Sequence, residues 1–173
     1  MSRPRLRVNP QIQIREAGPD DVEQIYAWIV ELATYERGPE QVTGTPQLLA
    51  EALFGSRPSA EALIAELAGQ DVGFALFHSN FSTWECRAGI WLEDLYVPPE
   101  DRRHGVGAAL LRRVAEITIE RGGTRLEWVV LDWNAPAIAL YQRVAANRLD
   151  DWRVYRLDGV ALAEVAEGVG RRR

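Results

Sequence analysis

Hydrophobic residues recur along the chain at two spacings, one helical and one strand-like. The helical spacing, with Pro and Gly marking the ends, predicts helices at 22–36, 46–54, about 108–121, 135–144 and 160–167. Alternating or continuous short apolar runs predict strands at 12–15, 72–77, 89–97, 124–131 and 152–157. Residues 61–68 fit either a helix or a strand, and the turn at Gly69 favours a hairpin with 72–77.

The order of these elements predicts the fold class. An antiparallel meander followed by a β-α-β-α-β tail indicates a single α/β domain with a mixed central sheet flanked by helices. We expect residues 1–11 to form an N-terminal arm, 12–160 the domain, and 161–173 a C-terminal helix with an arginine tail. No internal repeat or linker is present in the sequence.

Composition narrows the class of protein. The 173 residues are 47% hydrophobic and 26% charged, which is typical of one soluble globular domain. No apolar run approaches the roughly 20 residues of a membrane helix, and no secretory pattern follows Met1, so we expect a cytoplasmic protein without a membrane partner. A single cysteine excludes an internal disulfide and is consistent with a reducing compartment.

The basic residues are unusual, because all 20 are arginines. The absence of lysine excludes a P-loop and Schiff-base catalysis. Six of the arginines lie in the segments 1–7 and 171–173, so the rest of the chain is more acidic than the net charge of −5 indicates. An acidic body argues against a nucleic-acid partner and is compatible with a small cationic ligand, although a simple solvated acidic surface would give the same count.

The segment from Val97 to Ala108 predicts an anion-binding loop. An apolar strand ends, and a helix begins at Gly105 and Gly107. Glycines let backbone N–H groups approach a phosphate, and a helix N-terminus carries partial positive charge. Arg102 and Arg103 add charge, so the loop suits a pyrophosphate. The Rossmann pattern would need a third glycine where Leu110 stands.

The motif Arg102-x-x-Gly105-x-Gly107, followed by Asn134 and Tyr141, resembles the GNAT superfamily of N-acetyltransferases. Several segments resemble the diamine (spermidine/spermine) and thialysine acetyltransferases in particular: 31–36, 40–42, 91–97, 133–136 and 140–141. The resemblance covers roughly residues 10–160 and implies acetyl-CoA as co-substrate, a small-molecule amine as acceptor, and a homodimer in which the amine site can be shared. The residues that it implies for acetyl-CoA are Leu95, Tyr96, Val97, Arg102, Arg103, His104, Gly105, Val106, Gly107, Ala108, Asn134, Pro136, Ala137 and Tyr141.

Acetyl transfer to an amine needs a proton acceptor, an oxyanion donor and an acid for the departing thiolate. Tyr141 lies two helical turns after Asn134, and the resemblance makes it the acid; an ordinary core tyrosine is the alternative. Glu93 corresponds to the family's water-mediated base, and the backbone N–H near Leu95 to its oxyanion donor. Glu93 and Asp94 are adjacent, so they share one face of the strand only if a bulge intervenes.

The resemblance also implies an amine site. The residues assigned to it are Tyr35, Glu36, Trp84, Glu93, Asp94, Asp150 and Trp152. Tyr35 and Glu36 fit an ordinary helix end equally well, and Trp84 could simply anchor a loop. The loop around Asp150 is about three residues shorter than in the family, and Ala145 replaces a usual glycine. Both departures concern the identity of the amine more than acetyl transfer.

These features predict an acetyl-CoA-dependent N-acetyltransferase acting on the primary amine of a polyamine, a diamine or a lysine-like amino acid. A protein or peptide N-acetyltransferase and a non-catalytic acetyl-CoA sensor are the alternatives. Cys86, His78 and His104 do not have the spacing of a metal site, so we expect no metal.

Overall fold

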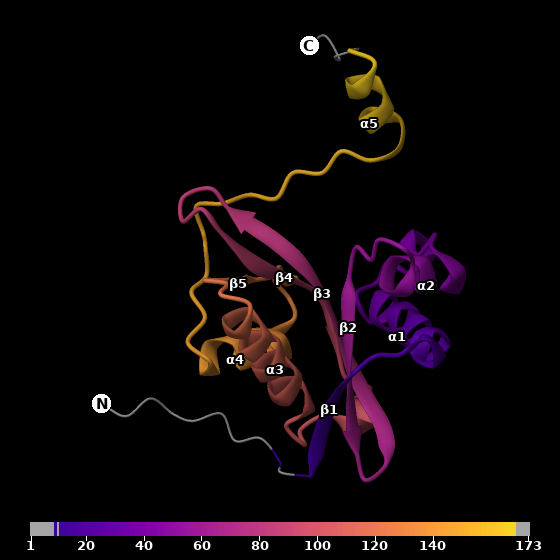
Figure 1. Cartoon of the computed structure of the whole chain (residues 1–173), viewed down its shortest axis with the longest axis vertical. Coiled ribbons are helices and arrows are strands. Elements are labelled where there is room, and N and C mark those ends of the chain that lie inside the picture. The colour runs from indigo at the N-terminus through magenta and orange to yellow at the C-terminus, as the bar shows by residue number, and fades with distance from the viewer. Residues whose placement is uncertain (1–8, 10, 169–173) are drawn as a thin grey trace.

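The computed structural model describes residue 9 and residues 11–168 of the chain (Figure 1). Within this range one sheet has the strand order β1-β2-β3-β4-β5, with antiparallel pairing up to β4 and a parallel β4–β5 pair. The strands are β1 Ile12–Glu16, β2 Glu61–Leu67, β3 Gln70–Ser82, β4 Arg87–Tyr96 and β5 Leu126–Glu127. The helices are α1 Val22–Tyr35, α2 Pro46–Phe54, α3 Val106–Glu120, α4 Ala135–Arg143 and α5 Gly159–Ala166, with short 3-10 turns at η1 Pro19–Asp21, η2 Pro39–Gln41 and η3 Pro99–Asp101.

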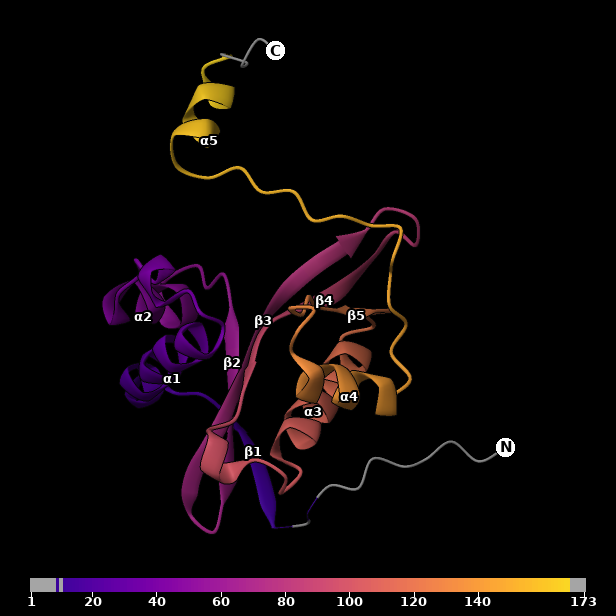
Figure 2. The same ribbon diagram turned by 180° about the vertical axis from the view of Figure 1, so that it is seen from behind.

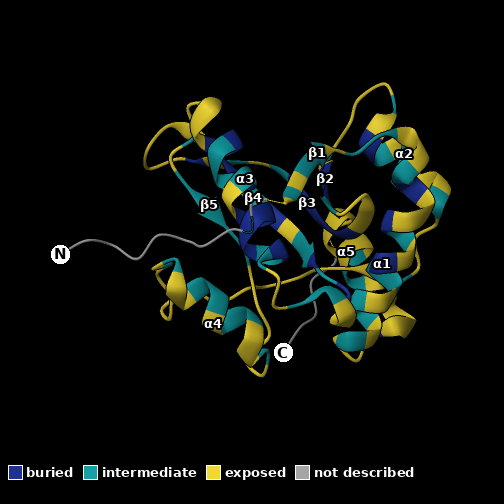
Figure 3. Cartoon of the chain, turned by 90° about the horizontal axis from the view of Figure 1, so that it is seen from below, coloured by how far each residue is buried: buried dark blue, intermediate teal, exposed yellow. Residues whose placement is uncertain are grey.

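Helices cover both faces of the sheet, as Figures 1 and 2 show: α1 and α2 lie on one side, α3 and α4 on the other. On the α1 side, Ile25 and Trp28 pack against Phe74, and the Trp28 and Phe74 rings are stacked with centroids 5.9 Å apart. On the α3 side, Leu110 and Val114 join Phe77, Leu92 and other strand residues in a second buried cluster. Figure 3 shows the buried positions of the helices facing inward, as their amphipathic spacing requires.

The early elements agree with the sequence predictions. The helices expected at 22–36 and 46–54 are α1 and α2, and the Thr45 side chain caps α2 by accepting from the Leu48 N–H. Residues 61–67 form a strand, which settles the choice left open for that segment. The predicted α/β domain with a mixed sheet and flanking helices is therefore confirmed.

Two predicted strands are wrong. The strand expected at 124–131 is reduced to Leu126–Glu127, and residues 128–131 have no regular secondary structure. Residues 152–157, also predicted as a strand, form an extended segment that pairs with no strand among the described residues. Both segments have strand-like sequences, but strand formation also needs a hydrogen-bonding neighbour, which a local pattern does not report.

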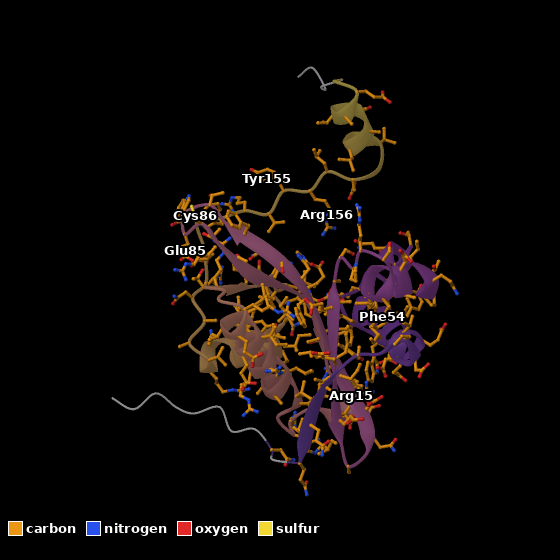
Figure 4. All side chains as sticks on the ribbon, in the orientation of Figure 1. Arg15, Phe54, Glu85, Cys86, Tyr155 and Arg156 are labelled. Carbon is orange, nitrogen blue, oxygen red and sulfur yellow. The ribbon has the colours of Figure 1, made fainter. Side chains whose placement is uncertain are left out.

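The C-terminal part leaves the body of the domain. We use the term C-terminal arm for residues 152–166, which run from the tip of the β3–β4 hairpin to α5 (Figure 1). Figure 4 places Tyr155 and Arg156 on this arm, and Glu85 and Cys86 at the hairpin tip near its start. The exposed large apolar residues of the arm are Trp152, Val154, Tyr155, Leu157, Val160, Leu162 and Val165.

Parts of the predicted termini, residues 1–8 and 10 of the N-terminal arm and 169–173 of the arginine tail, lie outside the described residues. Among the helices that the structure does describe, none combines the length and apolar character needed to cross a membrane.

Candidate active site

The loop predicted to bind an anion joins β4 to α3. After η3 the chain enters α3 through Gly105, whose φ of 92° lies in the left-handed region that glycine adopts without strain. The first N–H groups of a helix have no acceptor within that helix, so those at Val106, Gly107 and Ala108 are available to a ligand. Arg103 and His104 are exposed on the loop. These free N–H groups and the basic side chains beside them suit the diphosphate group of acetyl-CoA that the sequence predicts here.

Arg102, the first residue of the motif, is turned toward the body of the domain. Its Nε donates to the Val97 carbonyl oxygen at 2.9 Å, and its guanidinium lies 4.9 Å from the centre of the Tyr35 ring. This arginine therefore fixes the geometry of the loop, while Arg103 is the one left exposed beside it.

A β-bulge brings Glu93 and Asp94 to the same side of β4. Leu76 of β3 is opposite Asp94 and Phe77 is opposite Leu92, so Glu93 is the extra residue of the bulge. Glu93 accepts a 2.9 Å hydrogen bond from Trp91 Nε1, two residues earlier on the same strand face. Leu76, opposite Asp94, belongs to the core cluster on the α1 side. The predicted condition for both acids to share one face is thus met.

Asp94 is the more buried of the two carboxyls. Burial and, to a lesser extent, the negative charges of Glu93 and Glu36 together raise its pKa to about 7. Partial burial also raises the pKa of Glu36. A carboxyl in such surroundings favours its neutral form unless a cation binds beside it. These acids therefore form a site that a protonated amine would stabilise.

Tyr141 lies on α4, half-buried against Trp128 with ring centroids 4.8 Å apart. Burial raises its pKa to about 12, and the charge of Glu36 acts in the same direction. The hydroxyl therefore keeps its proton at neutral pH, as a general acid must before it acts. Glu36, just after α1, thus acts electrostatically on both Asp94 of β4 and Tyr141 of α4.

Tyr35 and Asn134, assigned to different substrates from the sequence, contact each other. The Tyr35 hydroxyl donates to Asn134 Oδ1 at 3.2 Å, and the same oxygen accepts from the Ala137 N–H as the N-cap of α4. Pro136 occupies the first turn of that helix.

The end of β4 places Leu95, Tyr96 and Val97 beside the loop. Tyr96 is buried, and its hydroxyl donates to Glu31, which with burial raises the Tyr96 pKa to about 12. The Tyr96 side chain is therefore part of the core, and only the backbone groups of Tyr96 are available to bind a ligand.

The remaining amine-site residues gather elsewhere, at the hairpin tip. Trp84 and Trp152 contact each other with ring centroids 6.3 Å apart, and both side chains are largely exposed. Asp150 forms an ion pair with Arg148. The structure therefore groups Trp84 with Trp152 where the C-terminal arm begins, whereas Glu93 and Asp94 lie on β4.

Sequence reasoning did not identify two neighbours of Glu93. Trp91 could have been found from its i, i+2 spacing, which places alternate strand residues on one face. His78, whose Nε2 lies 3.9 Å from a Glu93 carboxylate oxygen, depends on the pairing of His78 with Trp91 across two strands. That register is not visible in either segment alone.

Comparison with known proteins identifies the family of the chain. The model of the acetyltransferase (GNAT) family matches residues 22–146. The thialysine N-epsilon-acetyltransferase of Bos taurus is 36% identical over 166 residues, covering 90% of this chain and 97% of that protein. An L-ornithine N5-acetyltransferase of Arabidopsis thaliana is 28% identical, covering 88% of this chain and 87% of that protein. An integron cassette protein of V. cholerae, 22% identical, has the same fold with a TM-score of 0.74 over 92% of this chain and 99% of that one.

The family match spans the anion-binding loop, the bulge of β4 and the helix that carries Tyr141. The chain belongs to the acetyltransferase (GNAT) family and is an N-acetyltransferase.

Proposed function

We propose that this protein transfers the acetyl group of acetyl-CoA to the terminal primary amine of a small cationic acceptor. The observation that carries the proposal is the group of acids Glu36, Glu93 and Asp94, of which Glu36 also acts electrostatically on Tyr141, together with the glycine loop at the start of α3. Relatives named for thialysine and ornithine acetylation favour an amino acid with a terminal amine, and a diamine or polyamine has the same reacting group.

The acetyl-CoA diphosphate is expected at the backbone N–H groups of residues 105–108, with Arg103 and His104 on the solvent side. Bound there, acetyl-CoA supplies an activated carbonyl carbon. The N–H of Leu95 is the proposed donor to the carbonyl oxygen as negative charge develops. Asn134, Pro136 and Ala137 at the start of α4 are the proposed neighbours of the thioester end.

The proposed reaction is direct. An alkyl ammonium, with a pKa near 10.4, first loses a proton to Glu93 through a water molecule. The neutral nitrogen then attacks the carbonyl carbon, a C–N bond forms and the C–S bond breaks. The Tyr141 hydroxyl gives its proton to the departing thiolate. The attached nitrogen loses its second proton, which restores the Tyr141 hydroxyl through water, and the amide product retains one N–H. Asp94 and Glu36 attract the ammonium form and hold it beside Glu93.

We further propose a homodimer in which the C-terminal arms are exchanged. The arm presents an unpaired extended backbone and apolar side chains, including Tyr155 at 90% and Val154 at 75% exposure. Residues 128–131, which follow the two-residue β5, also pair with no strand of the described chain, and Val129 and Leu131 are exposed. A second copy offers the same open edge, so reciprocal strand addition would satisfy both segments in both chains. The Trp84–Trp152 group would then lie at the interface.

The test is release of free CoA from acetyl-CoA with thialysine, lysine, ornithine, putrescine, spermidine and a lysine-containing peptide. Selective release with one small amine supports the proposal and names the acceptor class. Release with the peptide alone would identify a protein acetyltransferase, and acetyl-CoA binding without product would identify a sensor.

The roles of the two catalytic residues have separate tests. Tyr141→Phe should lower kcat at least about 10-fold while acetyl-CoA affinity stays nearly unchanged, because it removes only the transferable proton. Glu93→Gln should reduce the rate most at low pH, where the amine most needs a base. An unchanged kcat for the first, or an unchanged pH profile for the second, would contradict the assigned role.

A further inference from the structure

Tyr35 lies where three parts of the molecule meet. It is the last residue of α1 and is half-buried. The Arg102 guanidinium lies 4.9 Å from the centre of the Tyr35 ring, and the Tyr35 and Trp133 ring centroids are 5.5 Å apart. Its hydroxyl donates to Asn134 Oδ1. One side chain therefore contacts the anion-binding loop and the start of α4 at the same time.

The contact on the loop side is fixed by further interactions. Arg102 Nε donates to the Val97 carbonyl at the end of β4, and the guanidinium also lies 6.0 Å from the Tyr96 ring centre. The Tyr96 hydroxyl in turn donates to Glu31, one helical turn before Tyr35 on α1. Arg102, the first residue of the motif, is thus held between the end of the strand and α1.

The contact on the α4 side involves the N-cap of that helix. Asn134 Oδ1 accepts from the Ala137 N–H at 3.3 Å, and N-cap interactions contribute on the order of 1 kcal/mol to helix stability. The Tyr35 hydroxyl orients the same oxygen at 3.2 Å. Trp133, just before the cap, contacts the Tyr35 ring, and the Arg37 guanidinium lies 4.9 Å from the Trp133 ring centre.

We propose that Tyr35 is a positioning residue that couples the acetyl-CoA loop to the helix carrying Tyr141. The ring holds Arg102, the hydroxyl holds Asn134, and Asn134 fixes the first turn of α4, from which Tyr141 is less than two turns away. Acetyl-CoA that orders the loop therefore also orders the general acid. This inference rests on the proposed function for the role of Tyr141, and it assigns Tyr35 a role other than direct contact with the amine.

The variant Tyr35→Phe removes the bond to Asn134 and keeps the ring under Arg102. A hydrogen bond contributes about 1 kcal/mol, roughly a fivefold effect, and misplacement of a catalytic group adds to that. We expect kcat to fall about 5- to 20-fold, with KM for both substrates within about twofold. Tyr26→Phe is the matched control, since Tyr26 also lies on α1 and donates to the Gly44 carbonyl at 2.8 Å. It should leave kcat unchanged.

A double-variant cycle tests the connection through Asn134. Asn134→Ala loses both hydrogen bonds to Oδ1, and Asn134→Asp keeps an acceptor oxygen at that position. We expect Asn134→Asp to recover part of the kcat lost in Asn134→Ala. Adding Tyr35→Phe to Asn134→Ala should give no further loss, because the two side chains act through one bond. Additive losses would overturn the coupling.

Hydrogen exchange separates this inference from the proposed function. In the parent, acetyl-CoA should slow exchange of the α4 amides, and in Tyr35→Phe it should slow them less, whether or not any amine is acetylated. If no amine is turned over but this difference is present, the proposed function fails and the coupling stands. Equal protection in both proteins, or a Tyr35→Phe variant in which only the KM for the amine changes, would overturn the inference.

Discussion

At the scale of single residues, Asp94 shows how one backbone irregularity changes the chemistry of a side chain. The bulge at Glu93 turns both acids toward one face, and burial then raises the Asp94 pKa to about 7. The same residue in a regular strand would point away from Glu93, and the two charges would interact less. The acidic site is therefore a property of strand register together with sequence.

The raised pKa of Asp94 predicts a pH-dependent stability. An unfolded aspartate titrates near 3.9 and the folded one near 7, so between these values the folded chain binds the extra proton and loses stability as pH rises. Asp94→Asn removes this loss. We expect it to raise the free energy of unfolding by on the order of 3 kcal/mol at pH 8 and by much less at pH 4, measured by urea denaturation.

The exposed Asp20 provides the control for that experiment. Asp20→Asn should change stability by no more than about 0.5 kcal/mol at either pH. A gain for Asp94→Asn that is equal at pH 8 and pH 4 would show that packing, and not the buried charge, accounts for it.

The same titration predicts how activity depends on pH. Below about pH 7 Asp94 is protonated and no longer attracts an ammonium group, so kcat/KM for the amine should fall as pH decreases through this value. In Asp94→Asn, kcat/KM should no longer fall as pH decreases through 7, and the KM for the amine at pH 8 should rise. The measurement is the initial rate at subsaturating amine from pH 5.5 to 9, and a limb that persists in the variant would assign the titration to another group.

At the scale of elements, the entrance to α3 depends on two glycines with different functions. Gly105 has a φ of 92°, where an alanine is strained by roughly 1–2 kcal/mol. A Cβ on Gly107 would lie 3.6 Å from Leu140 Cδ2, an ordinary contact, and alanine favours the helix. Gly105→Ala should therefore lower the Tm by a few degrees, and Gly107→Ala should not, as measured by thermal unfolding. A similar fall in both variants would contradict this distinction.

The elements that the sequence predicts correctly are those whose formation depends on local pattern. Helix α1 buries residues such as Ile25 and Trp28 at helical spacing. Helix α2 begins with Thr45 as its N-cap and Pro46 at its first position. The turn from β4 into α3 at Gly105 also follows from its glycines, and its anion-binding role stays a prediction. The β4 bulge and the proximity of Tyr35 to Asn134 depend on register and tertiary packing, so neither could be derived from the chain alone.

At the scale of the whole molecule, residues 153–157 of the C-terminal arm form an extended segment that pairs with no strand of the described chain. Its predicted strand at 152–157 has apolar residues on both faces, which is typical of a strand buried on both sides of a sheet. Exposed apolar patches of this kind mark interaction sites. The predicted strand does not form in the described chain because it has no hydrogen-bonding neighbour, and in the proposed homodimer a second copy would provide that neighbour.

If the homodimer forms by exchange of the C-terminal arms, charged residues introduced into the arm should dissociate it into single chains. We expect the parent to sediment at twice the 19.4 kDa chain mass, and the double variant Val154→Asp with Tyr155→Asp to sediment as a single chain at about 20 µM. The body should stay folded, because the large exposure of both side chains leaves them little to stabilise within their own chain. Leu48→Asp, equally apolar and 63% exposed but on α2, is the control that should remain dimeric. A parent that sediments as one chain across 1–100 µM, or an arm variant that remains dimeric, would show that the arm does not join two copies.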